Sequence, residues 1–306
     1  AGTDVLDVIA RSGTGSTTVV SGDIEPVDFV ITKSRNTTNA PVALTRLLGN
    51  YGLETDDTTA ATTNVLGTSI NPWDNQDGIR FTSDGDTNAS GGFNYINYFF
   101  RRAPGCFDVV TYNGSSSAQN ISHNLGVKPE LIIVKRRSAS ADWAVQDSTI
   151  GATYWLRLNT TSAKDDDDTM WNDTEPTASV FTVGTANNTG ANGSTYVGYL
   201  FATLSNISKV GSYSGTGSNV DVDCGFTAGA RFVLIKRTDS TGDWYLWDST
   251  RGIVSGNDPY IELNTSDAEV TNTDYLDPLN AGFTVTSSAP AALNTSGGTY
   301  LFLAIA

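Results

Sequence analysis

The amino-acid sequence predicts an all-β protein made of three tandem antiparallel β-sandwich units, jelly-roll-like and about 100 residues each. Composition is the first observation: the 306 residues include 30 Gly and only one Met, and Ser, Thr, Asn and Asp are abundant. Such a composition disfavours long helices, whereas Val, Ile, Tyr, Phe and Thr favour strands. The second observation is that short apolar runs alternate with turn residues about every ten positions, which is typical of a sandwich or barrel.

The third observation is an internal repeat. The runs Phe29–Lys33, Leu131–Lys135 and Phe232–Lys236 share one pattern and recur at spacings of 102 and 101 residues. Glycine-rich turns precede each run, and each unit closes on an aromatic strand; these strands are Tyr95–Phe100, Tyr196–Phe201 and Tyr300–Ile305. Self-similarity at a fixed period indicates one structural unit written three times.

We therefore divide the chain into unit 1 (residues 1–105), unit 2 (106–207) and unit 3 (208–306). The joints between them are short, so we expect the units to stand in a fixed row. The repeated Phe-Val-Leu-Ile-Lys type of strand is apolar at successive positions, which point to opposite faces of a sheet. Both faces must then be covered, and we predict that these strands are central. The stretches 58–63 and 165–168 are interpreted as exposed loops.

Charge and hydropathy exclude several classes of partner. The net charge is −15, so the chain would repel phosphate backbones, and nucleic acid is not expected as a partner. No apolar run approaches the length that crosses a bilayer, so no membrane insertion is expected. The opening residues Ala1-Gly2-Thr3-Asp4 show neither the cationic flank nor the apolar stretch of a signal peptide.

Cysteine and histidine usage predicts neither a disulfide framework nor a metal site. Cys106 and Cys224 lie in different units, and His123 is the single histidine. Three such distant ligands lack the spacing of a zinc cluster. We expect both thiols to be small core or bystander residues, and we predict no metal and no cofactor.

Paired carboxylates beside tryptophan suggest a glycosidase at first sight. Asp142 and Asp147 of unit 2 reappear as Asp243 and Asp248 of unit 3. An offset of five places the two carboxylates of each pair on opposite faces of an extended strand, whereas glycoside hydrolysis needs them to converge on one bond. Unit 1 lacks both groups, so we assign these residues to the fold and predict no catalytic residues and no enzymatic activity.

Other candidate residues also favour structural roles. His123 lies in a predicted turn, and no neighbouring nucleophile motif enlists it. The run Asp84–Asn88 imitates the start of a calcium loop but lacks its glycine and its final acid, so it is interpreted as a solvated turn.

Tryptophan supplies the one candidate binding site. Exposed aromatic rings beside Asn and Asp are how many β-sandwiches hold sugars. Trp143 and Trp244 correspond to each other and are assigned to cores, whereas Trp155 and Trp247 have no counterpart in all three units. We therefore name Trp155 and Trp247 as candidate glycan-contact residues, against the alternative of ordinary burial.

The chain resembles a known family. The segment Lys236–Tyr245 and the ending Ser296–Ala306 are similar to the repeat domain found near the carboxyl end of large structural proteins of marine tailed phages, including cyanophages. Unit 2 carries the likeness at 121–127 and 171–177, and unit 1 matches only loosely. In that family the repeat accompanies tail fibres and other virion structural proteins, and the domain has no established catalytic or binding residues.

The resemblance implies a virion location and a surface role. The first hypothesis is a tail fibre or tail-tip adhesin that binds a host surface glycan or receptor through many weak contacts. Homotrimerisation is expected for such a fibre and would explain strands that are apolar on both faces. The alternative is a purely structural virion protein, such as a capsid decoration, whose partners are other virion proteins; a polysaccharide depolymerase is the third hypothesis.

Overall fold

The structure is a computed structural model that describes residues 4–63 and 71–306, and it is nearly all β. Antiparallel sheets pack as sandwiches, which confirms the predicted fold class. Within the described residues no helix is long and apolar enough to span a membrane. The opening residues 1–3, which entered the expectation about a signal peptide, lie outside the described part.

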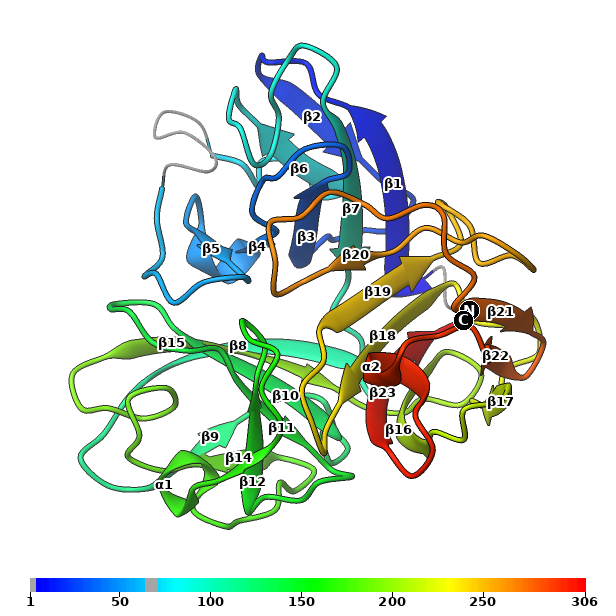
Figure 1. The fold of residues 1–306 in the computed structure, drawn as a ribbon. Helices are drawn as coiled ribbons and strands as arrows, with labels where there is room; N and C mark the ends of the chain where they lie inside the picture. The colour runs from blue at the N-terminus through cyan, green and yellow to red at the C-terminus, as the bar shows by residue number, and fades with distance from the viewer. Residues whose placement is uncertain (1–3, 64–70) are drawn as a thin grey trace.

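Each unit contributes one large and one small sheet (Figure 1). In unit 1 the large sheet has the order β1 (Leu6–Ser12), β7 (Asn94–Phe100), β3 (Phe29–Ser34), β4 (Val42–Thr45), β5 (Gly52–Glu54), and the small sheet pairs β2 (Thr18–Ser21) with β6 (Gly78–Phe81). In unit 2 the large sheet has the order β8 (Phe107–Asn113), β15 (Thr195–Phe201), β10 (Leu131–Arg136), β11 (Ala144–Asp147), β12 (Tyr154–Arg157), β13 (Asp165–Asp166), and the small sheet pairs β9 (Gln119–Ser122) with β14 (Val180–Val183). In unit 3 the large sheet has the order β16 (Ser208–Ser214), β23 (Thr299–Ile305), β18 (Phe232–Arg237), β19 (Trp244–Asp248), β20 (Ile261–Glu262), and the small sheet has the order β17 (Val220–Asp223), β22 (Gly282–Val285), β21 (Leu276–Leu279).

Helical turns are short. A 3-10 turn spans Arg46–Leu48, and the α-helices of the described residues are α1 (Asp168–Trp171) and α2 (Ala291–Asn294). Asp167 caps α1 by accepting a hydrogen bond from the backbone N–H of Thr169. The acidic run 165–168 was expected to be an exposed loop; it is mostly exposed, but Asp165–Asp166 form the edge strand β13 and Asp167 caps α1. Asp suits the cap because its carboxylate accepts from an N–H that has no backbone acceptor at a helix start.

The three repeated apolar strands are central, as predicted. Strand β3 lies between β7 and β4, β10 between β15 and β11, and β18 between β23 and β19. Their first four residues are buried in every case, so side chains on both faces of each large sheet are covered. The alternation of strand side chains therefore places two separate apolar layers around each sheet.

One layer of each large sheet forms the core of its own sandwich, and the other forms a core common to the whole molecule. The sandwich cores are built around Phe81 in unit 1, Phe181 in unit 2 and Phe283 in unit 3. The common core joins side chains of all three units, and Phe29, Tyr199 and Phe232 are members of it. We call it the shared core.

The shared core is tightly filled. The ring of Phe29 lies 4.4 Å from that of Tyr199, and the ring of Phe100 lies 5.8 Å from that of Phe232. A central cavity of about 30 Å³ remains, lined by residues of all three units. A volume of this size holds about one water molecule, so nearly all of the inner apolar surface is in contact.

This arrangement corrects the expectation of a row. The large sheets of the three lobes meet at a common centre, blue to cyan for unit 1, green for unit 2 and yellow to red for unit 3 (Figure 1). The second apolar face of each sheet is thus covered within one chain. The homotrimer remains a prediction, but the two-faced strands no longer call for it.

A lysine at the end of each central strand joins neighbouring units. Lys135 of unit 2 donates to the carbonyl of Thr58 in unit 1 at 2.9 Å, and to Ala141 of its own unit at 2.8 Å. Lys236 of unit 3 donates in the same way to Thr161 of unit 2 at 3.0 Å, and to its own Gly242 at 2.7 Å.

The first lysine closes the ring. Lys33 of unit 1 donates to the carbonyl of Ser266 in unit 3 at 2.7 Å and to its own Asn39. All three lysines are fully buried. Burial lowers the pKa of Lys33, Lys135 and Lys236 to about 8 each, because the charged ammonium loses its hydration. Each unit therefore holds the preceding one by the same bond, and unit 1 holds unit 3.

Indole and hydroxyl donors repeat this ring. Trp143 donates from Nε1 to the carbonyl of Glu54 at 2.9 Å, and Trp244 donates to Arg157 at 2.8 Å. Unit 1 has a proline at the corresponding position, and there Thr55 donates to the carbonyl of Leu263 at 2.6 Å instead. The stretch 58–63 was expected to be an exposed loop, and Thr58 and Thr59 are exposed; the Thr58 carbonyl also accepts from Lys135, so this loop contacts unit 2 as well.

A lysine clamp is expected to contribute strongly to stability. Replacing Lys236→Met leaves the carbonyls of Thr161 and Gly242 without their donor where units 2 and 3 meet, which costs about 3–5 kcal/mol of the free energy of unfolding. Chemical denaturation measures it. The control is Lys128→Met, whose side chain is 45% exposed beside Glu175 and whose loss costs less than about 1 kcal/mol. Equal midpoints for the two variants would refute the clamp.

Candidate functional site

The three unit junctions occupy equivalent positions but differ in chemistry. Strands β4, β11 and β19 pair with the central strands in the same register, so Thr45, Asp147 and Asp248 correspond to one another. We name each junction by the two units that meet there, so that units 3 and 1 meet at the 3/1 junction. Three residues further along the chain stand Leu48 at the 1/2 junction, Ile150 at the 2/3 junction and Arg251 at the 3/1 junction. One position in the fold thus carries two apolar side chains and one cation.

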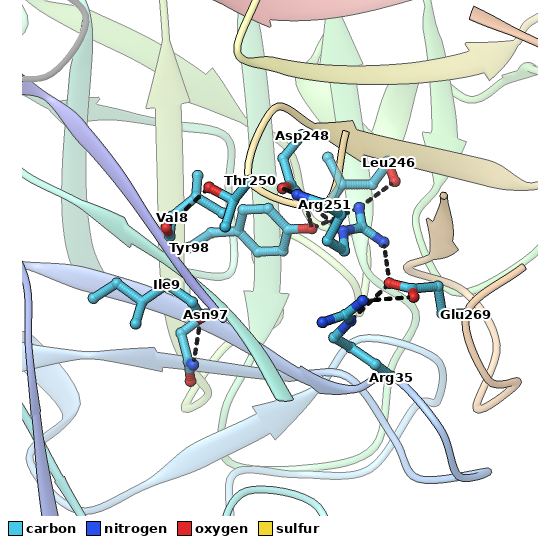
Figure 2. A network of polar contacts seen from close by, with 10 residues as sticks. All are labelled: Val8, Ile9, Arg35, Asn97, Tyr98, Leu246, Asp248, Thr250, Arg251 and Glu269. Carbon is cyan, nitrogen blue, oxygen red and sulfur yellow. Dashed lines mark hydrogen bonds and ion pairs between the residues drawn. The ribbon is translucent and has the colours of Figure 1, made fainter. Parts of the chain in front are cut away.

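The 3/1 junction holds a buried ion network (Figure 2). The side chain of Arg251 is fully buried and donates to Asp248 Oδ2 at 2.5 Å. It also contacts Glu269 Oε2 at 3.2 Å and donates to the Tyr98 hydroxyl of unit 1 at 3.0 Å. Tyr98 in turn donates to Asp248 Oδ2 at 2.8 Å. The carboxylates and the guanidinium therefore satisfy one another away from water, which a buried charge requires.

Further contacts complete the same junction. Arg35 of unit 1 forms a bidentate pair with Glu269, both bonds being 2.9 Å long. Thr250 donates to the carbonyl of Val8 at 3.1 Å, and Arg231 donates to that of Leu6 at 2.9 Å. Both carbonyls belong to β1, the edge strand of unit 1. All three guanidinium nitrogens of Arg251 have protein partners, and residues of units 1 and 3 supply them, so this network joins the two units (Figure 2).

The 2/3 junction lacks the ion network and the strand-edge hydrogen bonds of the 3/1 junction. Ile150 stands in place of Arg251, so the buried Asp147 has no cation. Its Oδ1 accepts from the N–H of Thr149 at 2.8 Å and from the Thr149 hydroxyl, while Oδ2 has no partner in the described chain. Burial raises the pKa of Asp147 to about 7; the Thr149 hydrogen bonds oppose this, and the charge of Glu130 adds to it.

A polar groove opens at this junction along β16, the edge strand of unit 3. Its larger lobe, about 430 Å³, and its smaller lobe, about 160 Å³, share Thr149, Ser212 and Tyr213. Glu130, Lys209, Asp221 and Asp223 bring charge to the larger lobe. Lys164 brings charge to the smaller lobe, beside several hydroxyl groups. We call this feature the β16 groove.

The predicted glycan-contact residues lie elsewhere, and the prediction is wrong in its physical premise. Trp155 is 3% exposed within the sandwich core of unit 2, where the Arg157 guanidinium carbon lies 3.9 Å from its ring centroid. Trp247 has no exposed surface and packs between Tyr245 and Tyr260 in the core of unit 3. Neither ring offers a face to a sugar, because a large aromatic surface gains more from burial against these neighbours.

The repeated carboxylates have structural partners. Asp142 accepts from Asn159 at 2.9 Å, and Asp243 accepts from Asn264 at 2.7 Å. Each asparagine also accepts the backbone N–H of the tryptophan that follows its aspartate. The Asp-Asn pairs thus fix the starts of β11 and β19, while Asp147 and Asp248 lie buried inside. The structure does not bring these four carboxylates to one accessible site.

The remaining candidates are also engaged in the fold. His123 is 6% exposed; its Nδ1 accepts from the N–H of Leu125, and its other nitrogen lies 3.2 Å from the Thr177 carbonyl. Cys106 and Cys224 are buried and free. Asp84 accepts from the N–H groups of Asp86 and Thr87, which closes its turn on itself.

Metal-ligand geometry is not found in this part of the molecule. Within residues 4–63 and 71–306, no group of three or more His, Cys, Asp and Glu side chains is arranged to hold a metal ion. The charged residues of the β16 groove are arranged around a strand edge, which suits hydrogen bonding to a ligand.

Sequence reasoning missed the clamp lysines, the ion network of the 3/1 junction and the groove of the 2/3 junction. A lysine at the end of an otherwise apolar run, three times over, was visible and signalled a buried charge with a repeated partner. The sequence also shows that Arg251 occupies the position that Leu48 and Ile150 occupy in the other units. The partner of Arg251, Glu269, lies in a loop that has no repeated motif.

The chain belongs to the family described as Domain of unknown function (DUF7483), which matches residues 1–306. A comparison with curated proteins gives no match.

The ion network is expected to depend on both charges together. Arg251→Leu removes the cation that pairs with the buried carboxylates of Asp248 and Glu269, and it costs about 3–5 kcal/mol of unfolding free energy. Combining it with Asp248→Thr reproduces the Thr45 and Leu48 of unit 1, and we expect recovery of at least about 1 kcal/mol. Chemical denaturation at pH 7 measures both. A double variant less stable than the single one would contradict the network's role.

Asp147 is expected to make stability depend on pH. Its pKa in the folded protein is about 7, above the unfolded value near 4, so its contribution is full below about pH 4 and is lost as the pH rises to 7. Asp147→Asn removes this loss and stabilises the protein at pH 8 by on the order of 2–4 kcal/mol.

The matched control is Asp248→Asn, which weakens the partner of Arg251 and destabilises at pH 8. Urea denaturation at pH 4.5 and pH 8 measures both variants. If Asp147→Asn gave no gain on going from the lower to the higher pH, the buried carboxylate would not be titrating as described.

Proposed function

We propose that this chain is a non-enzymatic phage virion surface protein, a tail fibre or tail-tip adhesin that binds a host surface glycan or receptor. The observation that carries the proposal is the shared core, together with the ring of lysine clamps. They join three sandwiches into one body by buried contacts. A body of this kind holds its outer loops in fixed relative positions, which suits attachment through many weak contacts.

Two further observations support the proposal. The likeness of units 2 and 3 to phage virion repeats supplies the setting. The carboxylates that suggested glycoside hydrolysis are buried or paired with Asn159 and Asn264, so they favour a role in the fold over chemistry. A depolymerase would need two other carboxylates that converge on one glycosidic bond.

A structural virion protein, such as a capsid decoration, is the second candidate. The open edge of β16 favours it, because an unpaired strand edge is a surface on which another virion protein can add. Homotrimer formation is compatible with either function.

Attachment is tested with the purified chain, fluorescently labelled, on whole host cells. We expect binding that survives moderate salt, competes with phage adsorption and falls when surface polysaccharide is stripped. Light scattering on the same preparation gives the copy number, with three expected.

A similarly acidic, unrelated β-sandwich serves as the control for charge. Absence of binding at tens of micromolar, roughly the affinity at which single weak contacts operate, would contradict attachment and favour the structural role. Release of reducing ends from host polysaccharide would instead establish a depolymerase.

A further inference from the structure

The backbone of β16 presents unpaired hydrogen-bonding groups to the β16 groove. At one end of the strand Ala306 N–H donates to Ile207, and at the other Gly215 N–H donates to Gly298. Because the ladder of an antiparallel pair alternates, the backbone groups of 209, 211 and 213 face β23, and those of 208, 210, 212 and 214 face away.

Part of this outer edge is closed within the chain. Ser208 N–H donates to the carbonyl of Leu204, and Val210 N–H donates to the Thr203 hydroxyl. Ser212 and Ser214 are exposed, and their outward N–H groups have no partner in the described chain. Both residues line the smaller lobe.

The corresponding edges of the other units each have one outward N–H accepted by a side chain, as in β16, but β1 also has partners from the neighbouring unit. In β1 the Asp7 carboxylate accepts the N–H of Val8, and Thr250 and Arg231 donate to carbonyls of the same strand. In β8 the Asp108 carboxylate accepts the N–H groups of Val109 and Asn124.

Three residue differences set the edge of β16 apart from that of β1. Lys209 stands where β1 and β8 have Asp7 and Asp108, so the Thr203 hydroxyl, and not a carboxylate, accepts the N–H of Val210. Glu130 stands where unit 3 has Arg231 and accepts the N–H of Thr203. Thr149 corresponds to Thr250, but its hydroxyl is bound by Asp147. The groups that seal the 3/1 junction are therefore absent or engaged elsewhere at the 2/3 junction.

The shape of the groove matches a strand. A peptide paired with β16 would lie about 4.8 Å from it and would send alternate side chains to opposite faces. The smaller lobe lies on the face of Ser212, Thr238 and Thr299, and the larger lobe reaches around the edge to β17. Five residues along 210–214 give a run of about 17 Å.

Charge defines the ligand further. Glu130, Asp221 and Asp223 face a single amine, Lys209, in the larger lobe. A cationic side chain is therefore favoured there; because Asp221 and Asp223 are exposed, salt weakens this attraction.

We propose that the free edge of β16 binds an extended polypeptide strand by β-sheet addition, with a Lys or Arg side chain of that strand in the larger lobe. This inference does not depend on the attachment function: a strand partner suits a receptor and a neighbouring virion protein equally.

The test uses the full chain and three capped, seven-residue peptides in which Thr alternates with Gln and the central residue is Lys, Gln or Glu. Fluorescence anisotropy measures binding, and hydrogen exchange reports on the amides of Ser212 and Ser214. We expect the Lys peptide to bind at least about fivefold more tightly than the Glu peptide. We also expect it to slow exchange at both amides.

The decisive variant is Ser212→Pro. It removes an outward N–H that β23 does not use, so the sheet keeps its ladder, and proline is tolerated at edge strands. Affinity for the Lys peptide should fall at least about tenfold. The matched control is Thr111→Pro at the corresponding outward position of β8, which should leave affinity unchanged.

A second variant tests the charge. Replacing Asp221→Asn and Asp223→Asn together should weaken the Lys peptide and leave the Gln peptide unchanged. The proposal is overturned if the Lys peptide fails to bind at millimolar concentration, if Ser212→Pro and Thr111→Pro behave alike, or if the groove takes only oligosaccharides. Cell binding that survives Ser212→Pro would leave the attachment function intact, so the two proposals fail separately.

Discussion

The structure depends on the burial of both faces of each large sheet. A sheet that is apolar on both faces needs two partners, and each unit supplies only one, its own small sheet. The second partner is the pair of large sheets from the other units, which meet in the shared core. The burial of one unit's inner face therefore requires the presence of the other two. This is why the three sandwiches form a ring around a centre and why their joints are short.

Equivalent positions in the ring carry different chemistry because a ring made by one chain is not bound by exact symmetry. Leu48 belongs to the shared core, Arg251 to an ion network, and Ile150 to the wall of a groove. A homo-oligomer would repeat any one of these solutions at every interface. A single chain can close one junction with an ion network and leave a groove at another, which is how the proposed ligand site arises here without loss of the shared core.

The sequence was sufficient for the fold class and the central strands, because strand period and turn residues are local signals. It was not sufficient for the way the units assemble. The apolar second face showed that a cover was needed, but a neighbouring unit and a second copy of the chain cover it equally well. Trp155 and Trp247 failed as surface residues for a related reason: their lack of counterparts in all three units reflects different packing in each core. Lys33 sits in the strand pattern, but its acceptor Ser266 is 233 residues away, beyond any local signal.

Ring closure explains where the ion network is placed. The lysine clamps of the first two junctions join residues 77 and 75 positions apart, whereas the clamp of the 3/1 junction joins residues 233 apart. The entropy of loop closure grows only with the logarithm of the length, so the longer loop costs about 1 kcal/mol more. The 3/1 junction adds the bidentate Arg35–Glu269 pair and the bonds from Thr250 and Arg231 to β1. Hydrogen bonds between charged groups contribute about 1.5–3 kcal/mol each when both partners are satisfied, so even one of them offsets the extra entropy. The junction that is farthest apart in sequence can thus be as firmly closed as the others, and the open groove falls at a junction whose closure is already favoured by its shorter loop.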